Sequence, residues 1–212
     1  IVFYSQPGSY DVSLTVTDSF GTSSQTYTNF ITYTDSVFPI TNTTSLYEGF
    51  ETGIFPPKSW QTPPASFSWE SIDIDTGLNC LPNTVAYVNH YWIEQNGKEA
   101  YLISNKVQLG LGSTAQNWLT YNYAYCGFSG HADGLRIEVS TDCGATWDSI
   151  YGASGTALQT TSYVNSPWYP TCGSWATDSI NLTNWGLNGD TIMVRFVAIN
   201  DYGNRFFMDN VN

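Results

Sequence analysis

The sequence predicts an all-β fold, and three observations support this prediction. Short segments in which apolar and polar residues alternate recur along the chain, as in residues 118–125 and 135–140, and this two-residue period is typical of strands with one buried face. Turn sequences rich in Gly, Asp, Asn and Pro separate them. No stretch of about 12 residues combines a 3.6-residue apolar period with helix caps. Short strands joined by turns indicate a β-sandwich or barrel, whereas a propeller needs a repeat every ~40–50 residues, which we do not find.

Residues 1–34 have the pattern of two strands joined by a turn. Apolar and polar residues alternate over 10–17, a turn follows at Asp18-Ser-Phe-Gly21, and residues 26–33 form the second strand. The pattern Pro-Gly-x-Tyr-x-Val-x-Leu-x-Val-x-Asp resembles the last two strands of a PKD domain, an immunoglobulin-like β-sandwich of extracellular proteins. The first half of that family's pattern, including Trp-x-Phe-Gly-Asp-Gly, is missing. We therefore expect the C-terminal part of a PKD-like domain.

Residues 35–46 are rich in Thr, Asn and Ser and predict a linker. A second domain over 47–212 follows. Its expected early strands are residues 85–88, 101–109 and 118–125.

Residues 140–147 contain the clearest local motif of the chain. Leu135, Ile137 and Val139 alternate with polar residues before it, and Asp142-Cys-Gly144 is a turn sequence. The motif resembles an Asp-box hairpin, Ser/Thr-x-Asp-x-Gly-x-Thr-Trp/Phe. Its defining positions are Ser140, Asp142, Gly144, Thr146 and Trp147. In that motif the Asp side chain satisfies turn amides and the aromatic ring folds under the loop, so we expect a structural role.

The last strands are expected at residues 175–182, 191–200 and 205–211, with a turn at 201–204. Both faces of 191–200 are apolar, which is typical of a central strand.

Composition and charge exclude several function classes. The chain has 212 residues and a net charge of −12 with six Lys plus Arg, too few cations for a phosphate-binding stripe, so we expect no nucleic-acid partner. No apolar run reaches the ~18 residues of a membrane span, so we expect no direct membrane insertion. Only 11% of residues are charged, against ~25% in typical soluble domains, as in many extracellular β-proteins. The chain begins inside a strand-like run, so we expect that its natural N-terminus lies upstream.

The four cysteines are Cys80, Cys126, Cys143 and Cys172. Their spacings match no zinc site, and an even count in this composition suits an oxidising compartment. Three pairings are possible, and we favour Cys80–Cys126 with Cys143–Cys172.

Several spaced motifs across the second domain agree in order with one known family. They are Phe50-Glu51, Trp60, Leu102-Ile-Ser104, Leu135-x-Ile-x-Val-Ser140, Asp142-Cys-Gly, Trp175, Arg195-Phe196 and Asp209-Asn210. This set resembles the jelly-roll module called cleaved adhesin or choice-of-anchor J, which is related to MAM domains and to galactose-binding-like carbohydrate modules. The resemblance implies a jelly-roll β-sandwich preceded by a partial immunoglobulin-like β-sandwich.

The resemblance also implies a function and a cofactor. Such modules occur in secreted or cell-surface proteins of Bacteroidetes, often exported by the type IX route, and attach non-covalently to glycans or proteins. The alternatives are an accessory domain of a secreted metalloprotease, docking on other domains of its own chain, or a filament or motility adhesin. A structural Ca²⁺ would be held by Glu51 and Asp209, with Glu48, Asp133 and Asn210 as weaker candidates; Ca²⁺ takes six to eight oxygen ligands.

Aromatic residues in loop-like stretches are the candidate ligand contacts. They are Tyr91, Trp92, Trp168, Tyr169 and Tyr202. Exposed aromatic rings stack on sugars or anchor proteins, and packing of a long loop explains them equally well. Trp60, Trp69, Trp118, Trp147 and Trp175 lie near strands, and we expect them in the core.

Enzyme motifs are not found, and we expect no catalytic residue. There is no His-Glu-x-x-His helix and no Gly-x-Ser-x-Gly elbow. His90 and His131, the two histidines, fall in expected loops and are interpreted as surface residues. Sialidases carry Asp boxes, but they repeat the box around a propeller. Asp73 and Asp75 share a loop without an apolar pocket that would raise one pKa, so they do not predict a glycosidase.

Overall fold

The computed structural model describes residues 8–19, 21–33, 46–63, 65–91, 93–94, 96–110, 116–183, 185 and 191–212. The chain divides into two compact units, residues 1–42 and 43–212. The described residues form strands β1 to β12 and one short 3-10 turn, Gly155–Ala157, so the predicted all-β class is confirmed. None of the described helices is long and apolar enough to cross a membrane.

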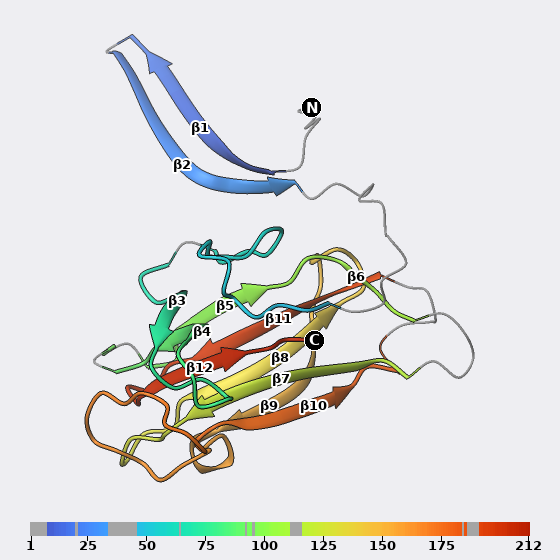
Figure 1. Cartoon of the computed structure of the whole chain (residues 1–212). Coiled ribbons are helices and arrows are strands. Elements are labelled where there is room, and N and C mark those ends of the chain that lie inside the picture. Colours follow the sequence, from blue (N-terminus) through green and yellow to red (C-terminus); the bar gives the residue numbers. More distant parts are fainter. Residues whose placement is uncertain are drawn as a thin grey trace. The chain divides into compact units, whose positions relative to one another are not determined.

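The N-terminal unit contains an antiparallel hairpin of β1 (Gly8–Asp18) and β2 (Gly21–Tyr33) (Figure 1). Asp18 accepts a hydrogen bond from the Gly21 amide at 3.0 Å, which closes the turn. Cross-strand hydroxyl pairs, such as Ser13 with Thr26 at 2.7 Å, line one face. Leu14 is exposed. A two-stranded hairpin buries too little apolar surface for stability on its own, and its assignment to a PKD-like domain stays a prediction.

The C-terminal unit is a sandwich of two five-stranded antiparallel sheets (Figure 1). The first sheet has the order β10-β7-β12-β4-β3, and the second has the order β5-β11-β8-β9, with β6 pairing on β11. The strands are β3 (Trp69–Ile74), β4 (Asn83–Asn89), β5 (Glu99–Ile103), β6 (Val107–Gln108), β7 (Trp118–Tyr125), β8 (Gly134–Ser140), β9 (Asp148–Ser154), β10 (Ala176–Asn181), β11 (Thr191–Ile199) and β12 (Arg205–Asp209). The central position predicted for 191–200 is confirmed, since β11 lies between β5 and β8.

Alternate residues of the facing strands form the core between the sheets. Phe206 and Met208 of β12 are fully buried, as are Ile137 of β8 and Phe196 of β11. The Phe196 ring lies edge-on to Tyr121 of β7, with centroids 5.7 Å apart, and so joins the two sheets. Burial of one such side chain stabilises the fold by about 1.5–3 kcal/mol. The alternation of apolar residues along a strand therefore favours the register that places all of them in the core.

The outer face of the first sheet carries a second, smaller apolar cluster, which we call the aromatic face. Its buried members are Ile74, Val85, Ala124 and Phe207, packed with Ile72, Tyr87, Trp168 and Trp175. The two tryptophans come from residues 158–175, which join β9 to β10 and which we call the covering loop. The Trp175 indole donates to the Thr76 carbonyl at 3.1 Å, so the covering loop is fixed against the β3–β4 connection.

The disulfide joins the same two segments and corrects the predicted pairing. Cys80 bonds to Cys172, 92 residues apart, so the pairs Cys80–Cys126 and Cys143–Cys172 are wrong. Cys126 is buried at the end of β7, where burial raises the pKa of its thiol to about 11. Cys143 is exposed in the turn before β9. Only Cys80 and Cys172 lie in loops that cross the same face of the sheet.

Candidate functional site

Three loops meet at one end of the sandwich and bring aromatic side chains together. Tyr91 follows β4, Phe128 and His131 lie between β7 and β8, and Tyr202 lies between β11 and β12. The Phe128 ring is 6.0 Å from Tyr91, 5.5 Å from His131 and 6.4 Å from Tyr202, between centroids. His131 and Tyr202 are 5.3 Å apart. We call these four residues the loop-end cluster, and each is half-buried.

Asp133 holds the turn that presents Tyr202. Its Oδ1 accepts the amides of Asp201 and Gly203 at 2.8 and 3.0 Å. Its Oδ2 accepts the Asn204 amide and the Tyr125 hydroxyl, each at 2.9 Å. These bonds satisfy a fully buried carboxylate. They also hold the backbone on both sides of Tyr202 against the sandwich and so position its side chain.

The backbone of this turn is unusual at two positions. A Cβ atom at Gly203 would lie 1.9 Å from the Asp133 carboxylate, so the position requires glycine. Tyr202 has a φ of 61°, a conformation that is strained for a bulky residue. Strain of this kind persists where the surrounding structure over-determines it and is concentrated at functional sites.

His90 lies beneath this turn and not on the surface. It is 1% exposed, and its Nδ1 lies 3.5 Å from Asp133 Oδ1. Burial lowers the pKa of His90, although the nearby Asp133 acts in the opposite direction. The prediction of a surface His90 is therefore wrong, because the residue packs against Phe67, 5.2 Å away between ring centroids.

The covering loop places two further aromatic residues beside this end of the sheet. Trp168 and Tyr169 both contact Phe207, with centroids 5.9 and 6.0 Å apart. Asn204 anchors the loop, since it accepts the Trp168 amide at 3.2 Å and donates to the carbonyls of Val164 and Ser166, both at 2.9 Å. Tyr169 nevertheless remains 47% exposed.

The structure brings together most of the aromatic residues predicted to contact a ligand. Tyr91 and Tyr202 meet through Phe128, and Trp168 and Tyr169 meet on Phe207. Trp92 lies outside the described residues. Phe128 was not predicted, although its setting in Gly127-Phe-Ser-Gly130 is the kind of small-residue loop that can present one ring. Trp118, expected in the core, is 48% exposed.

The predicted calcium ligands lie where the first residues of the unit pair with the last. Glu48 and Val211 exchange backbone hydrogen bonds of 2.8 and 2.9 Å. Burial, together with repulsion from Glu51 and Glu48, raises the pKa of Asp209 to about 6. Burial likewise raises the pKa of Glu48. Three carboxylates are thus close enough to repel one another.

The donor atoms at this place suit a hard cation, but the side chains do not form a complete shell. Carboxylate and amide oxygens of Glu48, Glu51, Asp209 and Asn210 are the ligand type that Ca²⁺ prefers. Asp209 Oδ2 accepts from Asn83 Nδ2 at 2.9 Å and from Asn210 Nδ2 at 3.1 Å. In the part of the chain that the structure describes, no three His, Cys, Asp or Glu side chains are grouped to hold a metal ion.

Asp133 does not belong to this group. It binds the turn before β12, whereas Asp209 ends that strand, and its two oxygens already accept four hydrogen bonds. A shared ion with Glu51 and Asp209 is therefore ruled out for Asp133.

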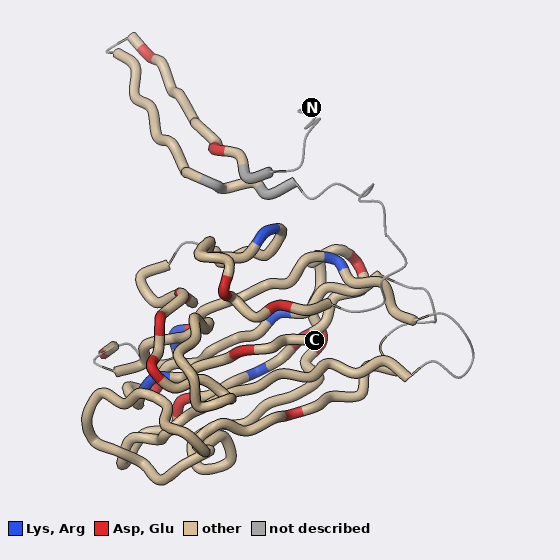
Figure 2. The backbone as a smooth tube through the Cα atoms, viewed as in Figure 1, with Lys and Arg blue, Asp and Glu red and all other residues tan. Residues whose placement is uncertain are grey.

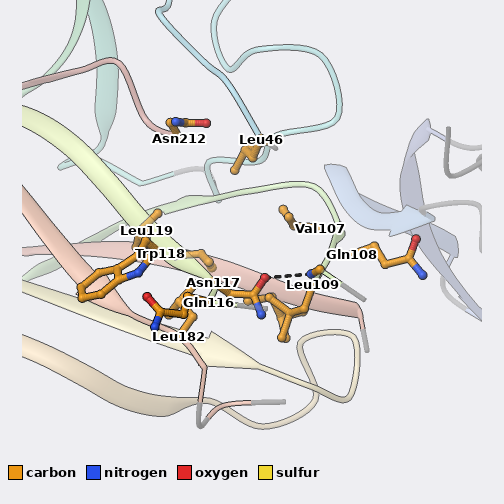
Figure 3. A pocket seen from close by; sticks show the side chains of 13 residues that line it. Leu46, Val107, Gln108, Leu109, Gln116, Asn117, Trp118, Leu119, Leu182 and Asn212 are labelled. Carbon is orange, nitrogen blue, oxygen red and sulfur yellow. Dashed lines mark hydrogen bonds between the residues drawn. The ribbon is translucent and has the colours of Figure 1, made fainter. Parts of the chain in front are cut away.

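A pocket of about 480 Å³ opens at the other end of the sandwich (Figure 3). Its walls are mainly aliphatic side chains, and its polar members are Gln108, Gln116, Asn117 and Asn212. Asn117 Oδ1 already accepts the Gly110 amide at 2.8 Å. Trp118 is its one aromatic member among the lining residues. This pocket therefore offers a sugar fewer ring faces than the loop end does.

The outer face of the second sheet carries a network of ion pairs, which we call the charged face. Glu138 of β8 binds Arg136 at 2.7 Å and also pairs with Arg195 of β11. Arg136 binds Glu99 at 2.9 Å. Figure 2 shows acidic and basic residues spread over the strands of the sandwich. The Arg195 guanidinium lies 4.3 Å from the centroid of the Trp147 ring. The charged groups and the ring of this face therefore contact one another.

The hairpin at residues 140–147 supplies that tryptophan. Asp142 accepts the Thr146 amide at 2.8 Å, the Thr146 hydroxyl at 2.7 Å and the Ser140 hydroxyl at 2.8 Å. These bonds, the Thr146 hydroxyl first, lower the pKa of Asp142 to about 2. The Trp147 indole donates to the Gly144 carbonyl at 3.1 Å. The hairpin therefore folds the tryptophan back over the charged face.

Comparisons with known proteins bear on the fold. The K1 cleaved adhesin domain of Lys-gingipain from Porphyromonas gingivalis W83 matches with a TM-score of 0.54 and 19% identity, over 78% of this chain and 95% of that one. The K3 cleaved adhesin domain of the same protein gives 0.50 and 19%, over 78% and 95%. TmCBM61, solved in complex with β-1,4-galactotriose, gives 0.47 and 16%, over 77% and 91%. No family model and no curated protein matches the chain. The chain thus has the β-sandwich fold of cleaved adhesin domains.

Proposed function

We propose that residues 43–212 form a non-catalytic extracellular module that binds glycans through the aromatic residues at its loop end. The observation that carries this proposal is the loop-end cluster itself, in which rings from three loops meet and Asp133 fixes the turn of Tyr202. The adhesin domains that share the fold support a role in attachment.

The chemistry of the cluster suits a sugar. The apolar face of a pyranose ring packs on Tyr or Phe rings, while nearby polar groups bond its hydroxyls. Asn96 and Asp201 supply such groups beside Tyr202, and Asn96 Nδ2 donates to Asp201 Oδ1 at 2.8 Å. Because Asp133 and Asn204 already fix the loops, binding would order few additional side chains, which limits the entropic cost of association.

A glycan array probed with the whole chain, followed by calorimetry on the best oligosaccharide, tests the proposal. We expect Tyr202→Ala to weaken binding roughly 3- to 10-fold, since one aromatic contact contributes about 0.5–1.5 kcal/mol. Trp118→Ala is the matched control, because Trp118 is also an accessible aromatic residue but lines the pocket at the other end. An array without binders, or equal losses in both variants, would contradict the proposal.

The location and the parent protein are part of the same proposal. We place the module outside the cell, as part of a secreted or cell-surface protein of Bacteroidetes, and the Cys80–Cys172 disulfide supports an oxidising compartment. The neighbouring structures are domains of a larger protein, Lys-gingipain, which favours a module that serves other domains of its chain. A zinc-protease signature in the parent sequence would support the accessory role, and repeated copies of the module would support a filament adhesin.

We also propose that Ca²⁺ binds between Glu48, Glu51 and Asp209, where it would relieve the repulsion of the three carboxylates. Calcium at 100 times its Kd would stabilise the folded state by about 2.7 kcal/mol, which raises the melting temperature by roughly 5–10 °C for a domain of this size. Melting in calcium and in EDTA tests this, and Asp209→Asn is expected to abolish most of the shift. Asp148→Asn, an exposed site on β9, is the control. Equal melting temperatures in calcium and EDTA would refute the site.

A further inference from the structure

Arg205 is the arginine of this chain whose charge the described residues do not neutralise. Arg136 and Arg195 each bind Glu138, and Arg136 also binds Glu99. For Arg205 the described residues offer no carboxylate within ion-pairing distance, in a chain with 18 Asp plus Glu. Its guanidinium instead lies 4.4 Å from the centroid of the Tyr169 ring.

Two of its nitrogens are buried, and the described residues give them no acceptor. Nε and Nη1 of Arg205 lack a hydrogen-bond partner among the described residues. A buried charged donor without an acceptor destabilises a fold, and planar guanidinium donors match the two oxygens of a carboxylate. Among the described residues, the group that these donors lack is therefore an anionic acceptor.

Asn89 offers the complementary group beside it. Arg205 of β12 and Asn89 of β4 are direct cross-strand partners, so their side chains lie on the same face of the sheet. The buried Oδ1 of Asn89 also lacks a partner among the described residues. An acceptor of this kind takes a hydroxyl donor. One ligand that brings both a carboxylate and a hydroxyl would satisfy both residues.

The aromatic rings around Arg205 and Asn89 indicate which class of ligand fits there. Tyr169 is exposed and covers the guanidinium, and Tyr87, the cross-strand partner of Phe207, stacks on it with centroids 6.0 Å apart. These rings offer a planar apolar surface to a sugar ring. We propose that Arg205, Asn89 and Tyr169 form a subsite for the carboxylate of an acidic sugar, a uronic or sialic acid. This inference rests on the proposed function and names its ligand class.

The test compares each acidic sugar with its neutral counterpart. Calorimetry with the whole chain would use trigalacturonic acid, 3′-sialyllactose and a hyaluronan tetrasaccharide, each against its carboxyl methyl ester, which keeps the shape and removes the charge. We expect at least one acid to bind about tenfold or more tightly than its ester, since hydrogen bonds between charged partners are roughly twice as strong as neutral ones. If no acid binds better than its ester, the inference is wrong.

Variants separate recognition from a structural role of Arg205. Arg205→Gln is expected to make the acid and the ester bind equally, and Arg205→Lys to recover part of the preference, because lysine keeps the charge but not the fork. Lys58→Gln, an exposed residue beside the segment that pairs with β5, removes the same charge elsewhere and should change nothing. If Arg205 only supports Tyr169, both ligands weaken in parallel and the acid-to-ester ratio stays unchanged, which overturns the inference.

The outcomes also separate this inference from the proposed function. Neutral esters that bind through Tyr202, with no preference for acids, would leave the glycan module standing and reject the Arg205 subsite. A preference for acids that is lost in Arg205→Gln but insensitive to Tyr202→Ala would support the subsite and move the glycan surface from the loop-end cluster to the aromatic face.

Discussion

The two outer faces of the sandwich use the same residue types in opposite ways. On the charged face, Arg136 and Arg195 are paired with Glu138, and the ring of Trp147 covers Arg195. On the aromatic face, Arg205 is covered by the Tyr169 ring but has no carboxylate partner among the described residues. Arginine with aromatic rings is therefore not by itself a sign of a binding site.

What separates the two faces is whether the polar atoms are already satisfied. The charged face contains both signs of charge within hydrogen-bonding distance, so a ligand would have to break existing bonds. The aromatic face contains donors and an acceptor, on Arg205 and Asn89, that the described residues leave unused. We infer that the first face stabilises the scaffold and that the second is available to a ligand.

The largest expected effect comes from breaking the charged face. Glu138→Ala leaves Arg136 and Arg195 partly buried without their shared partner, and removal of one member of a buried pair costs about 3–5 kcal/mol. Arg205→Gln, in contrast, should change the free energy of unfolding by less than about 1 kcal/mol, since no ion pair is lost. Urea unfolding of both variants measures the difference. Equal destabilisation would remove the distinction between the two faces.

The disulfide should give the next largest effect. Replacing both Cys80 and Cys172 with Ser opens a loop of 92 residues and is expected to lower the free energy of unfolding by about 2–4 kcal/mol. It should also loosen the covering loop, so that Trp175 fluorescence shifts to longer wavelength before global unfolding. Cys143→Ser, at an exposed free thiol, is the control and should behave as wild type. A double variant as stable as the control would show that the covering loop needs no covalent tie.

Local patterns predicted most of the strands, because alternation along a strand depends only on which face is buried. The eight residues of β7 and the seven of β8 follow such patterns. The patterns missed β3 (Trp69–Ile74), whose Asp73 was expected in a loop. The order of strands in a sheet depends on contacts between distant segments, and this is why the sequence misassigned the cysteines. β12 lies between β7 and β4, and this order creates the face that the loops of Cys80 and Cys172 cross.

The candidate site shows the same limit. Tyr91 and Tyr202 were predicted as separate loop residues, and only the fold shows that Phe128 lies between them. His90 was expected at the surface because nothing in its neighbourhood predicts the buried carboxylate of Asp133 beside it. That no described carboxylate pairs with Arg205 could not be predicted from the sequence either, since it depends on which carboxylates the fold brings near each arginine.

The pKa values of two carboxyl groups, Asp209 at the end of β12 and Asp142 in the turn between β8 and β9, are shifted in opposite directions, which gives a pH test. The pKa of Asp209, at the end of β12, is raised to about 6 by burial and by Glu51 and Glu48. The folded state thus favours the protonated form of Asp209. In EDTA, the contribution of protonated Asp209 to the free energy of unfolding is present below about pH 4 and is lost as the pH rises from about 4 to 6. Melting temperatures of wild type and Asp209→Asn should diverge over this range, with the variant more stable at pH 7. Parallel curves would contradict the assignment.

The smallest expected effect concerns Asp142, in the turn between β8 and β9. Its pKa is lowered to about 2 by hydrogen bonds from Thr146 and Ser140, so its contribution is present above about pH 4 and is lost as the pH falls towards 2. Asp142→Asn should lower the melting temperature by only about 1–2 °C at pH 7, because the group is exposed, and the difference from wild type should vanish near pH 2. A difference that is constant from pH 7 to pH 2 would mean that the turn depends on the shape of the side chain and not on its charge. In that case the contrast between Asp142 and Asp209 would no longer be electrostatic.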